Sequence, residues 1–251
     1  MLASELALAA ERLEAWHLGL YTVASGTTAT LGPVTVYHAG EPSPINFGLW
    51  HGRGPGTPQD NARSLASCED FLKARGVTPF VTAFSFVHPA VLRSLAERSY
   101  QLVGLLHLHA RTLDDTLGVP GAPCRVAPAD EWLEVAVDGF GAESRPIMAL
   151  TAKRPETTLW ICDVDGVAAS AGALSVRGQH AVLFSAATRP ALRGRGAQTS
   201  LLRARLQHAR SRGARFAFVM TSPGSDSERN VLRSGFSPLT TRLAFQRLAS
   251  A

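Results

Sequence analysis

Long hydrophobic runs are missing from this sequence of 251 residues. No stretch reaches the roughly 18 consecutive apolar residues that a membrane-spanning helix needs. The segment Met1–Trp16 contains Glu5, Glu11 and Arg12, and it has neither the basic start nor the small-residue cleavage site of a secretory signal. We therefore expect a cytoplasmic protein that does not cross a membrane.

Cysteine is scarce as well. The three cysteines, Cys68, Cys124 and Cys162, form no C-x-x-C pair and no Cys/His cluster at ligand spacing. This pattern excludes a disulfide framework and a structural zinc site, and it agrees with a reducing compartment. Because no histidine nearby in the sequence would activate Cys162, we interpret it as a buried structural thiol rather than as an acyl-enzyme nucleophile.

Lysine is the third scarcity, since Lys73 and Lys153 are the only two among 25 basic residues. The basic residues exceed the 20 acidic ones, which gives a net charge of +5. Such an excess favours anionic ligands. The arginines are spread along the chain and form no runs, which argues against a nucleic-acid-binding stripe, and guanidinium groups also bind the phosphates of small ligands.

The chain has the composition of a packed globular protein, with 45% hydrophobic and 18% charged residues. Its length favours two modest domains or one large domain. Turn-forming residues are concentrated between Thr112 and Pro128, with little apolar periodicity. We therefore predict a first domain over residues 1–118, a linker over 119–124 and a second domain over 125–251.

The first half alternates between predicted helices and strands. Leu6, Ala9, Leu13 and Trp16 share one face of an amphipathic helix. Strands are expected at 20–23 and 34–38, followed by a Gly/Pro-rich loop at 51–57 and a helix near 62–75. A strand at 79–86, a helix at 88–98 and a strand at 100–109 complete an α/β alternation.

The second half begins with a short strand at 124–126 and a helix on which Trp132 and Phe140 share a face. Strands at 159–164 and 167–176 are joined by Asp165-Gly166, a pair typical of a type I′ hairpin turn. A turn at Arg177-Gly178 leads into a third strand at 180–188. The pattern predicts an antiparallel meander that runs directly into a helix.

The start of that helix carries the strongest chemical signal, the segment Thr188 to Gln198 with Arg193-Gly194-Arg195-Gly196-Ala197 inside it. Glycines between a strand and a helix let backbone N–H groups turn inward, where the positive end of the helix dipole can cradle a pyrophosphate. Further along the helix, we predict that Arg203, Arg205 and Arg210 form its solvated face.

This segment resembles the acetyl-CoA loop of the GNAT acetyltransferase superfamily, in which Gln or Arg is followed by two residues, Gly, one residue, and Gly or Ala. Arg193 and Gly196 fit that pattern, and Gln198 stands where the family usually has Gly or Ala. Downstream, residues 215–221 look like the next core strand and residues 227–236 like the last helix, which ends in Gly235-Phe236. The similarity covers about residues 125–250.

Residues 1–118 resemble the degenerate amino-terminal half of tandem members in the segment from Phe71 to Gly76, the strand after it, and the segment from Leu95 to Val103. This half has no glycine loop before its helix except Gly52-Arg-Gly-Pro-Gly56, in which proline stands where a donor N–H is needed. The expected fold class is therefore α/β (α+β), with two GNAT-like halves. Each half would be a mixed, mostly antiparallel sheet flanked by helices. One acyl-CoA site is expected, and the first half would help to shape acceptor specificity.

The resemblance implies an N-acetyltransferase that moves the acetyl group of acetyl-CoA directly to an amine-bearing acceptor. The cofactor-binding residues that it implies are Ala187, Thr188, Arg193, Gly194, Arg195, Gly196, Ala197, Gln198, Ser227 and Asn230. Ser227 and Asn230 have an alternative interpretation, in which they only cap and solvate the last helix. Many relatives have a tyrosine as general acid four residues before the final Gly-Phe, and this chain has Val231 there.

The candidate base is Glu143, in the loop 141–146 where the family's substrate-lining loop would fall; a solvated carboxylate is the alternative. His107 and His109 lie on one side of a strand, but no third metal ligand is evident nearby in sequence, so no metal is expected. The rival function is a non-catalytic module that binds acyl-CoA or nucleic acid. The acceptor's identity and assembly as a homodimer stay open.

Overall fold

The computed structural model describes residues 3–23, 26–41, 43–52 and 54–248. Arg53, inside the glycine-rich loop predicted at 51–57, lies outside the described residues. The chain forms two compact units, which we call the first unit (residues 1–108 with 239–251) and the second unit (residues 109–238). Among the described helices, none is both long and apolar enough to cross a bilayer.

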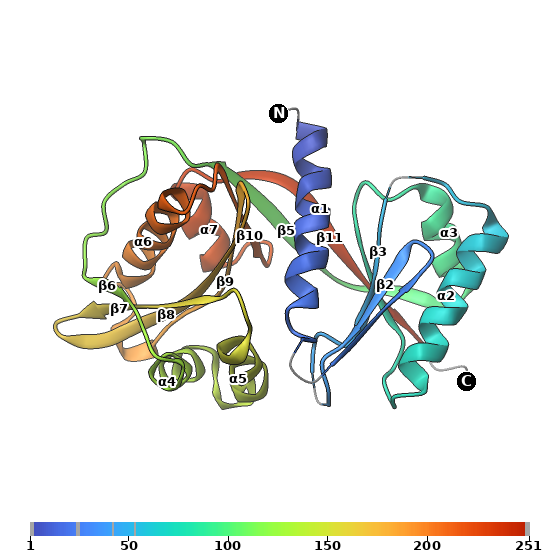
Figure 1. Ribbon diagram of the computed structural model, residues 1–251, viewed down its shortest axis with the longest axis horizontal. Coiled ribbons are helices and arrows are strands. Elements are labelled where there is room, and N and C mark those ends of the chain that lie inside the picture. Colours follow the sequence, from blue (N-terminus) through green and yellow to red (C-terminus); the bar gives the residue numbers. More distant parts are fainter. Residues whose placement is uncertain (1–2, 24–25, 42, 53, 249–251) are drawn as a thin grey trace. The chain divides into compact units, whose positions relative to one another are not determined.

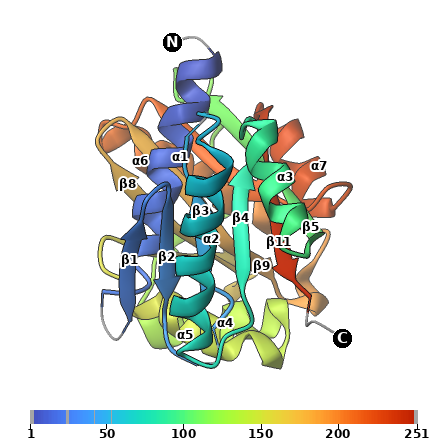
Figure 2. The same cartoon turned by 90° about the vertical axis from the view of Figure 1, so that its right-hand side faces the viewer.

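The first unit is a mixed sheet with helices on both faces (Figures 1 and 2). Its elements are α1 (Ala3–Gly19), β1 (Thr27–Leu31), β2 (Val34–His38), β3 (Phe47–Trp50), α2 (Pro58–Lys73), β4 (Phe80–Phe84), α3 (Pro89–Glu97), the beginning of β5 (Tyr100–Thr112) and most of β11 (Ser237–Arg247). The strand order is β1-β2-β3-β4-β11-β5. β3 and β4 are parallel, whereas β1/β2, β2/β3 and β4/β11 are antiparallel.

The first unit therefore takes one strand from the far end of the sequence. β11 pairs with β4 from Arg242 opposite Phe84 to Gln246 opposite Phe80. The division proposed from turn-rich sequence assigned these C-terminal residues to the second half. Hydrogen bonding to β4 is the physical reason that the compact unit contains them, since a strand belongs to the sheet whose backbone groups it satisfies.

In the second unit, the end of β5 is followed by β6 (Cys124–Val126), α4 (Ala129–Phe140), the 3-10 turn η1 (Ala142–Ser144), α5 (Arg145–Lys153), β7 (Thr158–Val164), β8 (Val167–Arg177), β9 (His180–Thr188), the 3-10 turn η2 (Pro190–Leu192), α6 (Ala197–Ser211), β10 (Phe216–Thr221) and α7 (Asp226–Arg233). The strand order is β5-β10-β9-β8-β7-β6. β9 and β10 are parallel, and the strands from β6 to β9 are antiparallel.

Helices cover both faces of the strands in the second unit, with α4 and α5 on one face and α6 and α7 on the other (Figure 1). The core on the α4 side is built around the fully buried Trp132 and Ile161, and the core on the α6 side around Leu183, Leu201 and Leu206. β8 is rich in small residues, so both layers approach it closely. The indole N–H of Trp132 donates to the carbonyl of Gly172 at 3.1 Å.

The predicted meander is confirmed. β7 and β8 pair across Asp165-Gly166, whose φ angles of 51° and 76° are the positive values that a type I′ turn requires. The expected α/β fold class is also confirmed, as a mixed, mostly antiparallel arrangement of strands flanked by helices.

Several elements differ from the sequence-based expectation. Residues 20–23, predicted as a strand, form turns after α1, where Leu20 and Tyr21 are buried as the end of that helix packs. The strands β1, β3 and β11 were not predicted; β1 and β3 have only five and four residues, which is too short for a clear alternating pattern. Part of the loop expected at 141–146 is helical, since Pro146 occupies the first turn of α5, where a missing N–H costs nothing.

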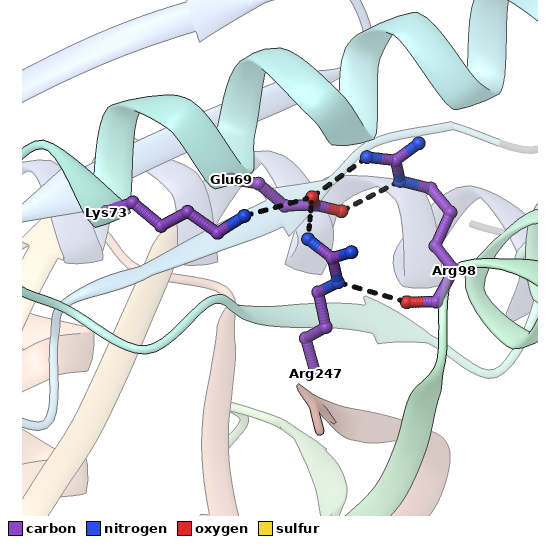
Figure 3. A network of polar contacts seen from close by, with 4 residues as sticks. All are labelled: Glu69, Lys73, Arg98 and Arg247. Atoms are coloured by element: carbon purple, nitrogen blue, oxygen red, sulfur yellow. Dashed lines mark hydrogen bonds and ion pairs between the residues drawn. The ribbon is translucent and has the colours of Figure 1, made fainter. Parts of the chain in front are cut away.

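A buried carboxylate joins three parts of the first unit (Figure 3). Glu69 on α2 is 2% exposed and receives two hydrogen bonds of 2.8 Å from Arg98, which follows α3. Arg247 on β11 donates to the same carboxylate and, through Nε, to the carbonyl of Arg98 at 3.2 Å. Lys73 approaches only to 3.9 Å and is half exposed. The carboxylate therefore ties α2 and the end of α3 to the C-terminal strand.

We expect Glu69→Gln to lower the free energy of unfolding by about 2–3 kcal/mol, because two guanidinium groups lose a charged acceptor in a buried place. Lys73→Ala is the matched control and should cost less than about 0.5 kcal/mol, as exposed ion pairs do. Urea unfolding followed by tryptophan fluorescence measures both. Equal losses for the two variants would show that the buried carboxylate has no special weight.

Candidate functional site

The main cavity of the second unit has a volume of about 610 Å³ and lies where the end of β9, the start of α6, the start of α7 and the end of α4 meet. This size falls within the range of sites for small molecules and cofactors. It is lined by Gly139, Phe140, Ala186, Ala187, Thr188, Leu192, Arg193, Gly194, Gly196, Ala197, Gln198, Thr199, Ser225, Asp226, Ser227, Arg229, Asn230 and Arg233.

The α6 N-terminus presents backbone donors to this cavity. Gly194 and Gly196 have φ angles of 78° and 77°, a left-handed conformation that other residues adopt only at a cost. Gly196 is the N-cap and has no side chain that could accept hydrogen bonds from the first turn. The N–H groups of Ala197, Gln198 and Thr199 therefore face a space that they line together, at the positive end of a 15-residue helix.

The end of β9 turns away from its neighbour at the same cavity. β9 pairs with β10 from His180 to Leu183 and then continues to Thr188. On its other side, the register with β8 shifts by one residue between Ala171 and Ala173. This is a bulge at Ser185, whose φ of 47° marks the extra residue. The bulge brings the backbone of Ala187 and Thr188 to the cavity wall.

A buried arginine supports that bulge from α6. Arg205 is 2% exposed and donates to the carbonyls of Ala173 at 3.0 Å, Phe184 at 3.4 Å and, within its own helix, Leu201 at 3.3 Å. Ala173 and Phe184 are the paired residues at which the β8/β9 register shifts. Burial lowers the pKa of Arg205 to about 10, so the guanidinium stays protonated at neutral pH.

The sequence-based assignment of Arg205 to a solvated face is wrong. Arg205 lies four residues after Leu201 and four before Ala209, and this spacing puts it on the buried face of α6. The positive charge of arginine suggests exposure, but the helical periodicity indicates the buried face, and the periodicity is right. Arg203 and Arg210 do lie on the exposed side, where Arg203 donates to the carbonyl of Val119 at 3.1 Å and Arg210 pairs with Asp115.

Cationic side chains surround the cavity mouth. Arg193 donates to the carbonyls of Thr188 at 3.3 Å and Gly139 at 3.2 Å, which holds the loop before α6 against the end of α4. Arg229 and Arg233 contribute from α7, and Arg229 pairs with Asp226. Three arginines against one carboxylate make the lining positive, which suits an anionic ligand.

The structure brings most of the predicted binding residues together in this cavity: Ala187, Thr188, Arg193, Gly194, Gly196, Ala197, Gln198, Ser227 and Asn230 all line it. Asn230 accepts a hydrogen bond of 3.0 Å from Thr199, which links α7 to α6. The N-cap of α7 is Ser225, not Ser227. Ser227 and Asn230 are therefore lining residues on the same helix.

Two predicted residues lie elsewhere. Arg195 is outside the lining, and its side chain forms a 2.9 Å ion pair with Asp165 in the β7/β8 turn. Glu143 is exposed in the 3-10 turn after α4, and its carboxylate folds back against Gly141 instead of lining the cavity. Sequence reasoning missed Arg229 and Arg233. Their spacing of four on α7 puts them on one helix face and was the available signal.

His109 has a carboxylate neighbour in the second unit. Its Nε2 lies 2.9 Å from Thr221 Oγ1 and 3.3 Å from Oε1 of Glu228 on α7, and His109 is fully buried. Glu228 also accepts the N–H of Gly224 at 2.6 Å. Sequence spacing did not reveal this neighbour, since Glu228 is more than a hundred residues away. Glu228 is thus a potential metal ligand that sequence spacing did not show, and its contact with His109 links α7 to β5.

Val231, at the position where many GNAT proteins have a tyrosine, is 4% exposed and packs in the core on the α6 side. The three tyrosines of the chain, Tyr21, Tyr37 and Tyr100, all belong to the first unit. The second unit therefore supplies no tyrosine hydroxyl of its own.

Comparison with known proteins agrees with this geometry. Residues 128–236 match the model of the acetyltransferase (GNAT) family. No curated protein matches the chain. Solved structures share the fold at low identity. A GCN5-related N-acetyltransferase from Kribbella flavida superimposes with a TM-score of 0.76 and 19% identity over 96% of both chains.

Two further structures are similar. A GCN5-related N-acetyltransferase from Sphaerobacter thermophilus has a TM-score of 0.59 and 18% identity, and the match covers 80% of this chain and 71% of that one. A tandem GNAT protein from the clavulanic acid biosynthesis pathway has a TM-score of 0.62 and 13% identity, with coverages of 87% and 79%. At these identities the likeness concerns the fold alone.

The α6 N-terminus can be tested with a matched pair of variants. Asn and Asp both tolerate the left-handed conformation of Gly196, and a Cβ there meets no atom within 4 Å. We expect Gly196→Asp to weaken acetyl-CoA binding at least about tenfold, because it puts a negative charge beside the helix N-terminus. Gly196→Asn should bind several-fold more tightly than the Asp variant. Calorimetric titration measures both, and equal affinities would reject a diphosphate at this position.

The role of Arg205 can be tested by Arg205→Met, which keeps an unbranched apolar stem and leaves two carbonyls of the bulge without their donor. We expect a loss of about 2–3 kcal/mol in the free energy of unfolding, together with weaker acetyl-CoA binding. Arg203→Met, on the exposed side of the same helix, is the control and should change stability by less than about 1 kcal/mol. Unchanged stability and affinity in Arg205→Met would show that Arg205 does not support the bulge.

Proposed function

We propose, from the match of residues 128–236 to the acetyltransferase (GNAT) family, that the second unit is an acyltransferase that uses acetyl-CoA as its acyl donor. One observation carries the proposal. The donor groups at the α6 N-terminus, the displaced end of β9 and three arginines surround the same 610 Å³ cavity. An extended ligand with phosphates at one end and a carbonyl at the other matches that sequence of groups.

The diphosphate of acetyl-CoA would bind the N–H groups of Ala197, Gln198 and Thr199. The phosphates are anionic, and the helix dipole and Arg193 both favour negative charge there. The pantetheine arm would then follow the end of β9, with Ser227 and Asn230 of α7 beside it. In this orientation the thioester would lie near the backbone of Ala187 and Thr188, whose polar groups could stabilise the oxyanion that forms during acyl transfer.

The acceptor that we propose is an amine, which attacks the thioester carbonyl directly. An alkylammonium group with a pKa near ~10 must lose a proton before it can attack, so a base is needed at neutral pH. The departing thiolate has a conjugate-acid pKa of about 8.5 and needs less assistance. This difference makes a buried Val231 compatible with turnover, because the absent tyrosine would serve the easier of the two proton transfers.

Glu143 remains our candidate for the base. Its turn follows directly after Gly139 and Phe140, which line the cavity, but its carboxylate is exposed and folds against Gly141. A rotation of this exposed side chain, or a bridging water, would connect it with an amine at the cavity mouth.

The second candidate function is a module that binds acyl-CoA without turnover. The hydrophobic residue at position 231 and the outward position of Glu143 favour it. Binding of nucleic acid has less support, since many arginines are engaged with carboxylates, among them Arg125, Arg145, Arg195, Arg210 and Arg229.

Turnover separates the two functions. The purified chain is incubated with acetyl-CoA and a panel of amines that includes polyamines, amino acids, aminoglycosides and peptide N-termini. Release of CoA is followed by chromatography. We expect release that depends on one acceptor class and that increases with pH as the amine is deprotonated. Tight binding of acetyl-CoA without release for any acceptor would favour the binding module.

Glu143→Gln then tests the base. We expect a decrease of about 10²-fold or more in kcat/KM and a flatter pH profile, with the Kd of acetyl-CoA unchanged. Glu156→Gln, which removes an exposed carboxylate from the turn before β7, is the matched control and should leave all three quantities unchanged. A Glu143→Gln variant with full activity would exclude this residue as the base.

A further inference from the structure

Two of the three cysteines lie directly opposite each other in the second unit. Cys124 on β6 is paired with Cys162 on β7 in an antiparallel register. The flanking backbone bonds run from Asp163 N to Pro123 O at 2.8 Å and from Ala127 N to Leu159 O at 3.0 Å. These pairs have the same register as the cysteines, so hydrogen-bonded and non-hydrogen-bonded pairs alternate along the ladder.

It follows that Cys124 and Cys162 form a non-hydrogen-bonded pair, one position away from the bonded pair at 123 and 163. In such a pair the Cα atoms are about 4.5 Å apart and the side chains approach each other closely. A disulfide requires a Cα separation of about 4.4–6.8 Å. The backbone therefore holds the two residues at a separation at which a disulfide can form without a rearrangement of the sheet.

The two thiols influence each other and differ in exposure. The side-chain interaction between them lowers the pKa of Cys162 and raises that of Cys124. Cys162 is fully buried, whereas Cys124 is only half-buried on the edge strand. Cys124 is consequently the thiol that a small oxidant can reach, and Cys162 is the neighbour that can resolve the oxidised product.

We propose that Cys124 and Cys162 form an oxidation site, at which a hydroperoxide converts the thiol pair into a reversible cross-strand disulfide. In the first step the sulfur of Cys124 attacks a peroxide oxygen, the O–O bond breaks, and the products are a sulfenic acid and water. In the second step Cys162 attacks the sulfur of that sulfenic acid. The S–S bond forms, the S–O bond breaks, and hydroxide leaves with the proton of Cys162 as a second water molecule.

Two thiols and one hydrogen peroxide thus give one disulfide and two waters, and a dithiol reductant reverses the change. The disulfide would also affect the strand β6, which has three residues and lies at the end of the strand order. The segment before it contacts α6 through two hydrogen bonds, from the N–H of Gly121 to the hydroxyl of Ser200 and from the side-chain amide of Gln207 to the carbonyl of Gly118. A covalent link from β6 to β7 would fix both the edge strand and that segment.

Cys68 provides an internal comparison. It is fully buried in the first unit, whereas the other two cysteines belong to the second unit. A small oxidant cannot reach its sulfur, and no cysteine is paired with it, so it should stay reduced under conditions that oxidise the pair.

The test uses the full chain treated with hydrogen peroxide, followed by alkylation under denaturing conditions and peptide mass spectrometry without reduction. We expect loss of two of the three thiols, a peptide pair joined through Cys124 and Cys162, and complete recovery after dithiothreitol. The melting temperature of the oxidised chain should increase by roughly 5 °C or more, because the link closes a long loop in the unfolded chain.

Variants make the outcome decisive. Cys124→Ser should abolish both the cross-link and the increase in melting temperature, whereas Cys68→Ser should change neither. Cys162→Ser should leave Cys124 at the sulfenic acid or further oxidised, and if this variant does not fold, Cys124→Ser alone decides. Cross-linked dimers through Cys124, over-oxidation of Cys124 in the unmodified chain, or three intact thiols after peroxide treatment would each overturn the proposal.

Discussion

The geometry of the candidate site depends on one buried cation. Arg205 donates hydrogen bonds to the carbonyls of Ala173 and Phe184, where the β8/β9 ladder is interrupted. These bonds offset part of the free energy that burying the charged guanidinium costs. Without a donor at this point, a bulge would leave polar groups unsatisfied between two packed layers. Because Arg205 belongs to α6, the same contact also sets the distance between the helix and the sheet. The position of the α6 N-terminus therefore follows from an interaction two turns away.

This arrangement explains how a small set of backbone groups can become a binding surface. The bulge at Ser185 directs the end of β9 away from β10, and the left-handed glycines before α6 expose N–H groups that no residue of the chain needs for its own fold. The positive φ angle of Ser185 is a strained conformation that the packed core must hold in place, whereas the glycines adopt theirs at little cost. In the function that we propose, phosphate and carbonyl groups would be bound mainly by backbone, and Arg193 would fix the loop and add charge.

Local signals in the sequence predicted backbone conformation better than they predicted the partners of individual side chains. Glycine and hairpin signals are local, because positive φ angles restrict residue choice, so Asp165-Gly166 and Arg193–Gln198 could be located directly. Arg205 and Cys124/Cys162 were misread or missed because their meaning depends on partners that are distant in sequence. Glu228 beside His109 is a further case. Short strands such as β1 and β3 depend on neighbours for their pairing and leave little trace in composition.

The path of the chain adds a constraint that composition cannot show. The strands of the first unit include β11, which follows the second unit in the sequence and brings Arg247 to Glu69 and Arg242 to Glu14. Before β11 pairs with β4, the buried carboxylates of Glu14 and Glu69 each lack one charged partner, and one edge of β4 has no hydrogen-bonded strand. The free energy of such a state is high, since an unpaired strand edge and an unpaired buried charge are both unfavourable, and binding of β11 lowers it. The first unit can therefore reach its final stability only after the second unit, which precedes β11 in the sequence, has been translated.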